Sequence, residues 1–168
     1  LFTTRETAKL IKYASNAFLA TKITFINEIS DLCEKVGANV SDVSTGMGLD
    51  GRIGKKFLHP GPGYGGSCFP KDTIALVKTA NDVSSKLELI SHVVKYNQDR
   101  KKNIYKKVKK ACGDSLKNKK IAILGLTFKP NTDDMRDSPS IELIKALLKE
   151  GAKLNLYDPE GMLEAKKI

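Results

Sequence analysis

A stripe of apolar residues at helical spacing runs through the first part of the chain and constrains its fold more than any other feature. Its members recur every three or four residues, at Leu10, Ala14, Ala17/Phe18, Phe25, Ile29, Leu32/Cys33 and Val36. This spacing predicts one helix of about 30 residues, roughly 45 Å long. A capping box at Thr3 and Glu6 predicts its start, and Gly37 predicts its end. Because a small domain cannot bury so long a helix alone, the helix could run through a subunit interface.

Further helices are predicted before residue 113. Ser41 and Asp42 begin a short helix that Gly46 and Gly48 stop. Residues 49–71 are predicted as loop, residues 72–80 as a helix and residues 85–111 as another helix. The polar connector at 113–118 predicts a boundary between a helical domain over 1–113 and a second domain over 118–168.

The pattern after this connector predicts one βαβ unit. Residues 120–125 and 153–157 are short apolar runs typical of buried parallel strands, and Ser138-Pro139 begins a helix between them. Asp158 closes the second strand, as an acid does in dinucleotide sites. However, the turn after the first strand lacks the pattern GxGxxG, so this unit is not predicted as the primary site for NAD. A lone βαβ unit is too small to be stable, so it is expected to be the start of a domain.

Composition excludes several classes of protein. No apolar run approaches the roughly 18 residues of a membrane span. The three cysteines, Cys33, Cys68 and Cys112, lack the spacing of a zinc site or a disulfide framework. Their number and separation favour a reducing, cytoplasmic setting, with Cys33 and Cys112 in helical cores.

The formal net charge of +10 is concentrated in two basic runs, Arg100–Lys102 and Lys106–Lys110. We interpret these runs as a solvated helix face, because no nucleic-acid recognition motif accompanies them. A basic nucleic-acid-binding domain is the weakest of the alternatives that the sequence leaves open.

The segment Gly61–Asp72, GPGYGGSCFPKD, which we call the glycine loop, contains the residue types that point most directly to a catalytic site. Its four glycines and two prolines exclude a helix or an ordinary strand over most of its length. Pro70 and Asp72 suit a helix start, so Cys68 is predicted at a loop-to-helix junction, where a thiolate is favoured. Cys68 is therefore a candidate nucleophile; the alternative is a tight glycine turn in which the cysteine only packs.

Lys12 and Asn16 lie four residues apart and share one face of the long helix. From spacing alone, a solvated polar stripe is the simpler interpretation. Similarly, His59 by itself, followed by Pro60, is better interpreted as a loop residue than as a catalytic base.

The chain resembles the UDP-glucose/GDP-mannose dehydrogenase family in several motifs. The glycine loop is similar to the active-site loop of these NAD-dependent enzymes, which oxidise a nucleotide sugar twice, from alcohol to acid. Lys12–Ala20 is similar to the family's K-x-x-x-N-x-F-L-A segment, and Asp50–Leu58 to its substrate loop. The resemblance implies catalytic roles for Cys68, Lys12, Asn16 and Asp72. It implies that Lys12, Asn16, Arg52, Phe57, His59, Gly65 and Lys129 bind substrate, that Lys71 and Arg136 reach NAD, and that no metal takes part.

The resemblance also implies what the whole protein does. It implies a helical central dimerisation domain followed by the start of a Rossmann-like UDP-binding domain, with a homodimer built through the long helix. The family's amino-terminal NAD-binding domain lies outside these 168 residues, so the chain is expected to be a fragment without turnover of its own. Ser67 and Phe69–Asp72 favour UDP-glucose as substrate; GDP-mannose, another nucleotide sugar, or a non-catalytic dimerisation and sugar-nucleotide-binding module are the alternatives.

Overall fold

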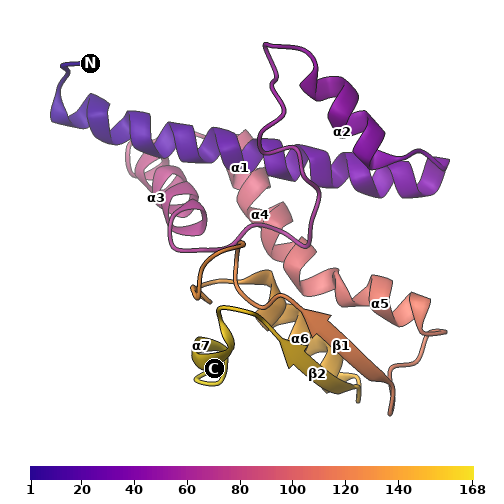
Figure 1. The fold of residues 1–168 in the computed structure, drawn as a ribbon. Helices are drawn as coiled ribbons and strands as arrows, with labels where there is room; N and C mark the ends of the chain where they lie inside the picture. The colour runs from indigo at the N-terminus through magenta and orange to yellow at the C-terminus, as the bar shows by residue number, and fades with distance from the viewer. The chain divides into compact units, whose positions relative to one another are not determined.

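A computed structural model describes all 168 residues, Leu1–Ile168 (Figure 1). The chain divides into two compact units, each of which draws on two segments of the sequence. The first comprises Leu1–Gly63 and Cys68–Asn97, and the second comprises Tyr64–Ser67 and Gln98–Ile168. The chain is mostly helical, and its only sheet has two strands. None of its helices combines the length and apolar character that a membrane crossing requires.

Helix α1, Arg5–Val36, is the predicted long helix and lies in the first unit. Its N-cap is Thr4, one residue after the predicted cap, because the Thr4 hydroxyl accepts the N–H of Thr7 at 3.2 Å. Gly37 ends it with a left-handed φ of 73°, as predicted. The buried face of α1 consists of small and polar residues and one large apolar residue, Ile26: Ala17, Ala20, Thr24, Ile26, Asn27, Ser30 and Cys33.

Most of the large apolar residues of α1 lie outside this buried face and are not covered by the chain. Phe18 is 66% exposed, Leu32 53% and Phe25 43%. Leu10 and Val36 are exposed as well. The predicted stripe is thus present as a helix face, but within these residues it is largely open to solvent.

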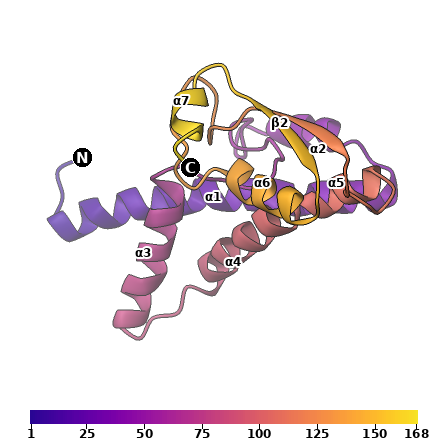
Figure 2. The same cartoon turned by 90° about the horizontal axis from the view of Figure 1, so that it is seen from below.

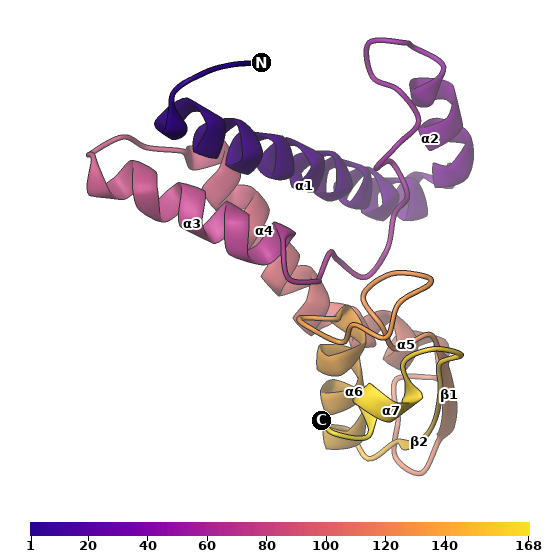
Figure 3. The same ribbon diagram turned by 60° about the vertical axis from the view of Figure 1, so that its left-hand side comes forward.

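The first unit contains two further helices and part of a third. They are α2 (Val40–Gly48), α3 (Phe69–Asp82) and the first part of α4 (Glu88–Asn103). Helices α2 and α3 both pack on α1, as Figure 3 shows. Figure 2 shows the short turn that joins α3 to α4. Side chains of α4 bond to α1, with the Tyr96 hydroxyl 3.1 Å from the Asp31 carboxylate. Helix α3 begins three residues before the predicted start because Pro70 is accepted in its first turn.

The single helix predicted over 85–111 is two helices, α4 and α5, Tyr105–Ala111. The side-chain amide of Asn103 donates to the Asp99 carbonyl at 2.7 Å. In a regular helix, that carbonyl accepts the backbone N–H of the residue four positions later. Asparagine competes with the backbone in this way, and its presence explains the break that apolar periodicity did not predict.

The second unit contains the predicted βαβ arrangement. Strands β1, Lys120–Leu124, and β2, Lys153–Tyr157, are parallel, and the crossover helix α6, Pro139–Lys149, has Ser138 as its N-cap. A short helix, α7, Met162–Ala165, follows and was not predicted. Buried Leu116, Leu147 and Ala152 form the core, onto which Tyr105, Val108 and Cys112 of the α5 region and apolar side chains of both strands and α6 pack. Because α5 packs on this core, it belongs to the second compact unit. The domain bounds predicted from the sequence, 1–113 and 118–168, remain a prediction.

Asp158 ties the turn after β1 to the turn after β2. Its side chain is buried, and its carboxylate accepts the backbone N–H groups of Leu126, Thr127, Glu160 and Gly161 at 2.7 to 3.1 Å. These bonds, the one from Leu126 above all, hold the pKa of Asp158 well below its usual range. Both carboxylate oxygens are therefore engaged by the chain's own backbone rather than available to the ribose of a dinucleotide.

We expect Asp158→Ala to lower the free energy of unfolding by about 2–3 kcal/mol, because charge-assisted bonds are lost and buried N–H groups are left unpaired. The pKa of Asp158 is lower in the folded than in the unfolded chain, so at low pH the unfolded state takes up the proton first. The stabilisation is thus present above about pH 4 and lost as the pH falls below it. Urea unfolding at about pH 6 and pH 3 should show a smaller deficit for the variant at the lower pH, whereas exposed Asp133→Ala should behave as the parent. An equal deficit at both pH values would contradict this role.

Candidate functional site

Cys68 lies where the sequence predicted it, at the junction between the glycine loop and α3. It is the residue immediately before the helix, its side chain is exposed, and it forms no disulfide. The Cys68 carbonyl accepts the backbone N–H of Asp72 at 2.8 Å, which closes the first turn of α3. The thiol and the Asp72 carboxylate are therefore separated by one helical turn.

The packing of α3 on α1 brings together three of the predicted catalytic residues. The Asn16 amide donates to Oδ2 of Asp72 at 2.7 Å, and the Lys12 ammonium lies 3.5 Å from the same oxygen. The Asp72 side chain is fully buried, whereas that of Lys12 is 59% exposed. The two α1 residues thus contact the same buried carboxylate, which a purely solvated polar stripe would not do.

The second oxygen of Asp72 has no partner within the chain. Its Oδ1 atom is buried and makes no hydrogen bond. Buried carboxylate oxygens without partners are rare in folded proteins, because each loses its hydration without compensation. Such an atom, on a carboxylate that contacts an amide and an ammonium group and lies one helical turn after Cys68, fits a site that receives a water molecule or a hydroxyl group from outside.

The predicted substrate loop lies between α2 and α3 and carries Arg52, Phe57 and His59. The Arg52 guanidinium forms a paired contact with Asp50 at 2.5 and 3.0 Å, and its hydrogen bonds lower the pKa of that carboxyl group. Phe57 has a φ of 65°, unusual for a residue with a side chain, and its ring centroid lies 6.0 Å from that of Phe69. His59 is exposed. These contacts order the loop, and none of the described polar contacts joins Arg52 to the Lys12 cluster.

Three predicted cations lie on exposed positions. Lys71 is exposed in the first turn of α3, and Lys129 is exposed with its ammonium 5.3 Å from the centre of the Phe128 ring. The Arg136 side chain contacts Asp134 at 2.7 and 2.9 Å and lowers the pKa of that carboxyl group. Exposed cations of this kind can meet the phosphates of a nucleotide.

Gly65 is buried at a place where no other residue fits. A Cβ atom on Gly65 would lie 2.3 Å from the carbonyl oxygen of Asp137. The next residue, Gly66, has a φ of +83°, and a Cβ atom there would lie 2.6 Å from the Phe128 ring. The bare backbone predicted for this loop is therefore used, at these two positions, in packing within the second unit, to which residues 64–67 belong.

Sequence reasoning missed the residues that hold the loop in place. The Asn27 carboxamide oxygen accepts the N–H of Gly61 at 2.8 Å, and the Ser44 hydroxyl donates to the Leu58 carbonyl at 2.6 Å. Lys101, assigned to a solvated basic face, is instead only 5% exposed. Asn27, a polar residue within an apolar helix pattern, was the one available signal; the partner of Lys101 is 36 residues away and no local pattern indicates it.

Two family profiles match the chain. The UDP-glucose/GDP-mannose dehydrogenase family, central domain, matches residues 6–99. The UDP-glucose/GDP-mannose dehydrogenase family, UDP binding domain, matches residues 122–168.

Individual relatives agree with these profiles. The chain is 64% identical over 168 residues to a UDP-glucose 6-dehydrogenase of Rhizobium meliloti (strain 1021), covering 100% of this chain and 38% of that protein. It is 51% identical over 161 residues to a UDP-glucose 6-dehydrogenase of Rickettsia felis, covering 96% and 36%. A solved UDP-glucose dehydrogenase structure from the hyperthermophilic archaeon Pyrobaculum islandicum superposes with a TM-score of 0.89 and 38% identity, over 95% of this chain and 37% of that one. The chain thus spans 36–38% of the length of the relatives it matches.

Proposed function

The chain belongs to the UDP-glucose/GDP-mannose dehydrogenase family, and we propose that it is part of an NAD-dependent UDP-glucose 6-dehydrogenase, which oxidises UDP-glucose twice to UDP-glucuronate. One observation carries this proposal. The buried Asp72 carboxylate, held by Asn16 and Lys12, lies one helical turn after the exposed thiol of Cys68. This set combines a nucleophile, a cation and an acid, which oxidation of an alcohol to an acid through a covalent intermediate requires.

UDP-glucose is the proposed substrate because the relative with 64% identity over the whole chain is a UDP-glucose 6-dehydrogenase. The match to a UDP binding domain over 122–168 supports a uridine nucleotide. The segment around Cys68, with Ser67 before it and Phe69–Asp72 after it, favours the same sugar. In this proposal Lys129 meets the diphosphate, Phe57, His59 and Gly65 each contact the nucleotide sugar, and Arg52 reaches the sugar bound by a neighbouring subunit.

We assign Lys12 and Asn16 to the C6 oxygen of the sugar. That oxygen gains negative charge when the alcohol loses its proton and again when the aldehyde carbon is attacked, so a cation and an amide donor lower the energy of both states. An asparagine amide has two N–H groups, and only one is used by Asp72. The other can serve the substrate, while the exposed Lys12 ammonium has room to reach it.

We assign Cys68 as the nucleophile of the second oxidation. Its thiolate adds to the aldehyde carbon and forms a C–S bond, which gives a thiohemiacetal. Loss of a hydride from that carbon to the dinucleotide, and of the hydroxyl proton to solvent, leaves a thioester. Water then attacks the thioester carbon, the C–S bond breaks, and the carboxylate and the thiol are released. The unpartnered Oδ1 of Asp72 is the atom that we propose holds this water.

NAD, when bound, accepts one hydride in each oxidation. The βαβ unit does not fit its primary site, because Asp158 is engaged by backbone N–H groups and the turn after β1 lacks the glycine pattern. The exposed cations Lys71 and Arg136 do fit contacts to the phosphates of a dinucleotide held mainly by other residues. We therefore assign these two to the cofactor.

The stoichiometry of NADH tests this function. The intact protein that contains these residues should form two NADH for each UDP-glucose consumed, because both oxidations occur before release. GDP-mannose and an N-acetylated UDP-sugar at the same concentration should give little NADH. One NADH per sugar, or a preference for GDP-mannose, would contradict the assignment.

We further propose a homodimer formed through α1 and a Rossmann-like fold for the domain that begins at residue 118, in a cytoplasmic protein. The exposed apolar face of α1, with Phe18, Phe25 and Leu32, supports the dimer, because a face of this size is rarely left to solvent. The parallel β1–α6–β2 arrangement supports the Rossmann-like start. Light scattering should give the mass of a dimer, and a monomer at micromolar concentration would exclude it.

A further inference from the structure

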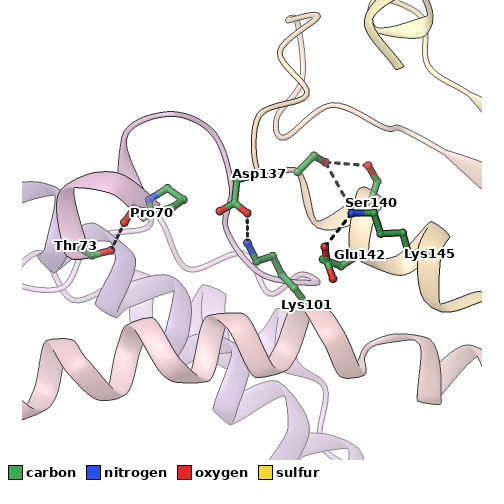
Figure 4. Close-up of polar contacts among 8 residues, drawn as sticks. Pro70, Thr73, Lys101, Asp137, Ser140, Glu142 and Lys145 are labelled. Atoms are coloured by element: carbon green, nitrogen blue, oxygen red, sulfur yellow. Dashed lines mark hydrogen bonds and ion pairs between the residues drawn. The ribbon is translucent and has the colours of Figure 1, made fainter. Parts of the chain in front are cut away.

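An ion pair between a buried lysine and a partly exposed aspartate lies beside the glycine loop and has no part in the chemistry above. Lys101, in the last part of α4, is 5% exposed, and its ammonium lies 2.7 Å from Oδ1 of Asp137 (Figure 4). The Asp137 side chain is 45% exposed. Lysine is almost never fully buried without a partner, because its ammonium loses its hydration. The burial of Lys101 therefore depends on Asp137, which it holds at a fixed place.

Asp137 is itself in an unusual backbone conformation. Its φ is 51°, in the left-handed region that residues with a side chain seldom occupy. Ser138, the next residue, is the N-cap of α6, and its hydroxyl lies 2.9 Å from that of Ser140. The segment is thus fixed on one side by α6 and on the other by Lys101.

The glycine loop contacts this same segment directly, at Gly65 and Gly66. The Asp137 carbonyl oxygen lies so close to Gly65 that no side chain fits between them, and the N–H of Gly66 donates to the Arg136 carbonyl at 2.8 Å. Cys68 follows Gly66 by two residues. Any change in the path of residues 136–137 is therefore passed along the backbone toward the thiol.

From this chain of contacts we propose that Lys101 and Asp137 are positioning residues for Cys68. The ion pair holds Asp137 in its left-handed conformation, this conformation places the Arg136 and Asp137 carbonyls, and these carbonyls fix Gly65 and Gly66. The catalytic consequence rests on the function proposed above. Because a misplacement of about 1 Å can slow a reaction about a hundredfold, the pair controls the covalent step without touching the substrate.

The test replaces Lys101 by methionine, which keeps its length and removes its charge, in the intact protein. Lys109→Met is the matched control, because Lys109 forms an ion pair of the same 2.7 Å length with Glu150 in the same unit, away from the glycine loop. Hydrogen exchange of the peptide that contains Gly66 reports on the loop directly. We expect Lys101→Met to speed this exchange about tenfold and Lys109→Met to leave it unchanged.

Two further measurements connect the loop to the thiol. Alkylation of Cys68 by iodoacetamide, followed by mass spectrometry of its peptide, should change in rate at least about threefold in Lys101→Met. Oxidation of the supplied aldehyde should slow about tenfold while the Michaelis constant for UDP-glucose stays within about twofold. Lys101→Arg, which keeps the charge, should restore most of each value.

The outcomes separate this proposal from the proposed function. Exchange and alkylation do not depend on activity, so they test the positioning role even if the enzyme acts on another substrate. Unchanged exchange at Gly66 in Lys101→Met, or the same change in Lys109→Met, would overturn it. If Lys101→Met does not fold, Asp137→Asn, whose side chain tolerates the left-handed conformation, should give the same faster exchange, and its failure to do so would overturn the proposal equally.

Discussion

Cys68→Ser in the intact protein should stop the oxidation of UDP-glucose at the second step. Removal of the first hydride needs no sulfur, so a single turnover should still produce one NADH and the aldehyde. The second oxidation requires an adduct at the aldehyde carbon, and a serine hydroxyl is a poor nucleophile without an activating base. We expect aldehyde oxidation to fall by at least about a thousandfold, and a slowly hydrolysed ester to accumulate if the hydroxyl does react.

Single-turnover kinetics with UDP-glucose, and then with the aldehyde supplied directly, measure the two steps separately. Cys112→Ser is the matched control, since Cys112 is a thiol that packs on the core of the second unit. It should leave both oxidations close to the parent rates. If Cys68→Ser oxidised the aldehyde to free acid as fast as the parent, the covalent role of Cys68 would be wrong.

The local elements of this fold could be predicted because their signals are local. The long helix, its end at Gly37, the two strands and the start of α6 at Ser138 follow from apolar spacing and from caps that involve neighbouring residues. The break at Ile104 was missed because one asparagine side chain competes with the helix. Which face of α1 is buried could not be predicted either. Apart from Ile26, the buried residues are small or polar and most large apolar ones are exposed, because packing partners rather than hydrophobicity alone decide which face is covered.

Within the candidate site too, relations between residues close in the sequence could be predicted, whereas contacts between distant residues could not. Sequence placed Cys68 at a helix start and Asp72 one turn later, because both relations lie within five residues. The contact of Asp72 with Asn16 joins residues 56 positions apart and was not predicted; the resemblance to a family implied only that both residues take part in catalysis. Lys101 was assigned to a solvated face because its neighbours are basic; its burial depends on Asp137, which no spacing in the sequence connects to it.

The residues of the proposed site differ in how much the packing of the fold depends on them. Asp72 and Asn16 lie in the packed contact between α1 and α3, so changing either alters the fold as well as the reaction. Lys12 reaches the same carboxylate from a largely exposed position. Lys12 is therefore the residue at which a catalytic effect can be measured with little loss of stability.

Lys12→Ala should slow both oxidations by about 10²–10³, in contrast to Cys68→Ser, because its cation serves an oxygen that carries charge in each step. The unfolding temperature should change little, since the Lys12 side chain is 59% exposed and the Asn16 amide still donates to the Asp72 carboxylate. Lys9→Ala is the matched control: the Lys9 and Lys12 ammonium groups lie 5.8 and 5.7 Å from the centre of the same Tyr13 ring, and Lys12 also contacts Asp72. Rates for UDP-glucose and for the aldehyde, measured at saturation in both variants, decide the outcome. A loss confined to one of the two oxidations, or an equal loss in Lys9→Ala, would show that Lys12 does not stabilise the shared oxygen.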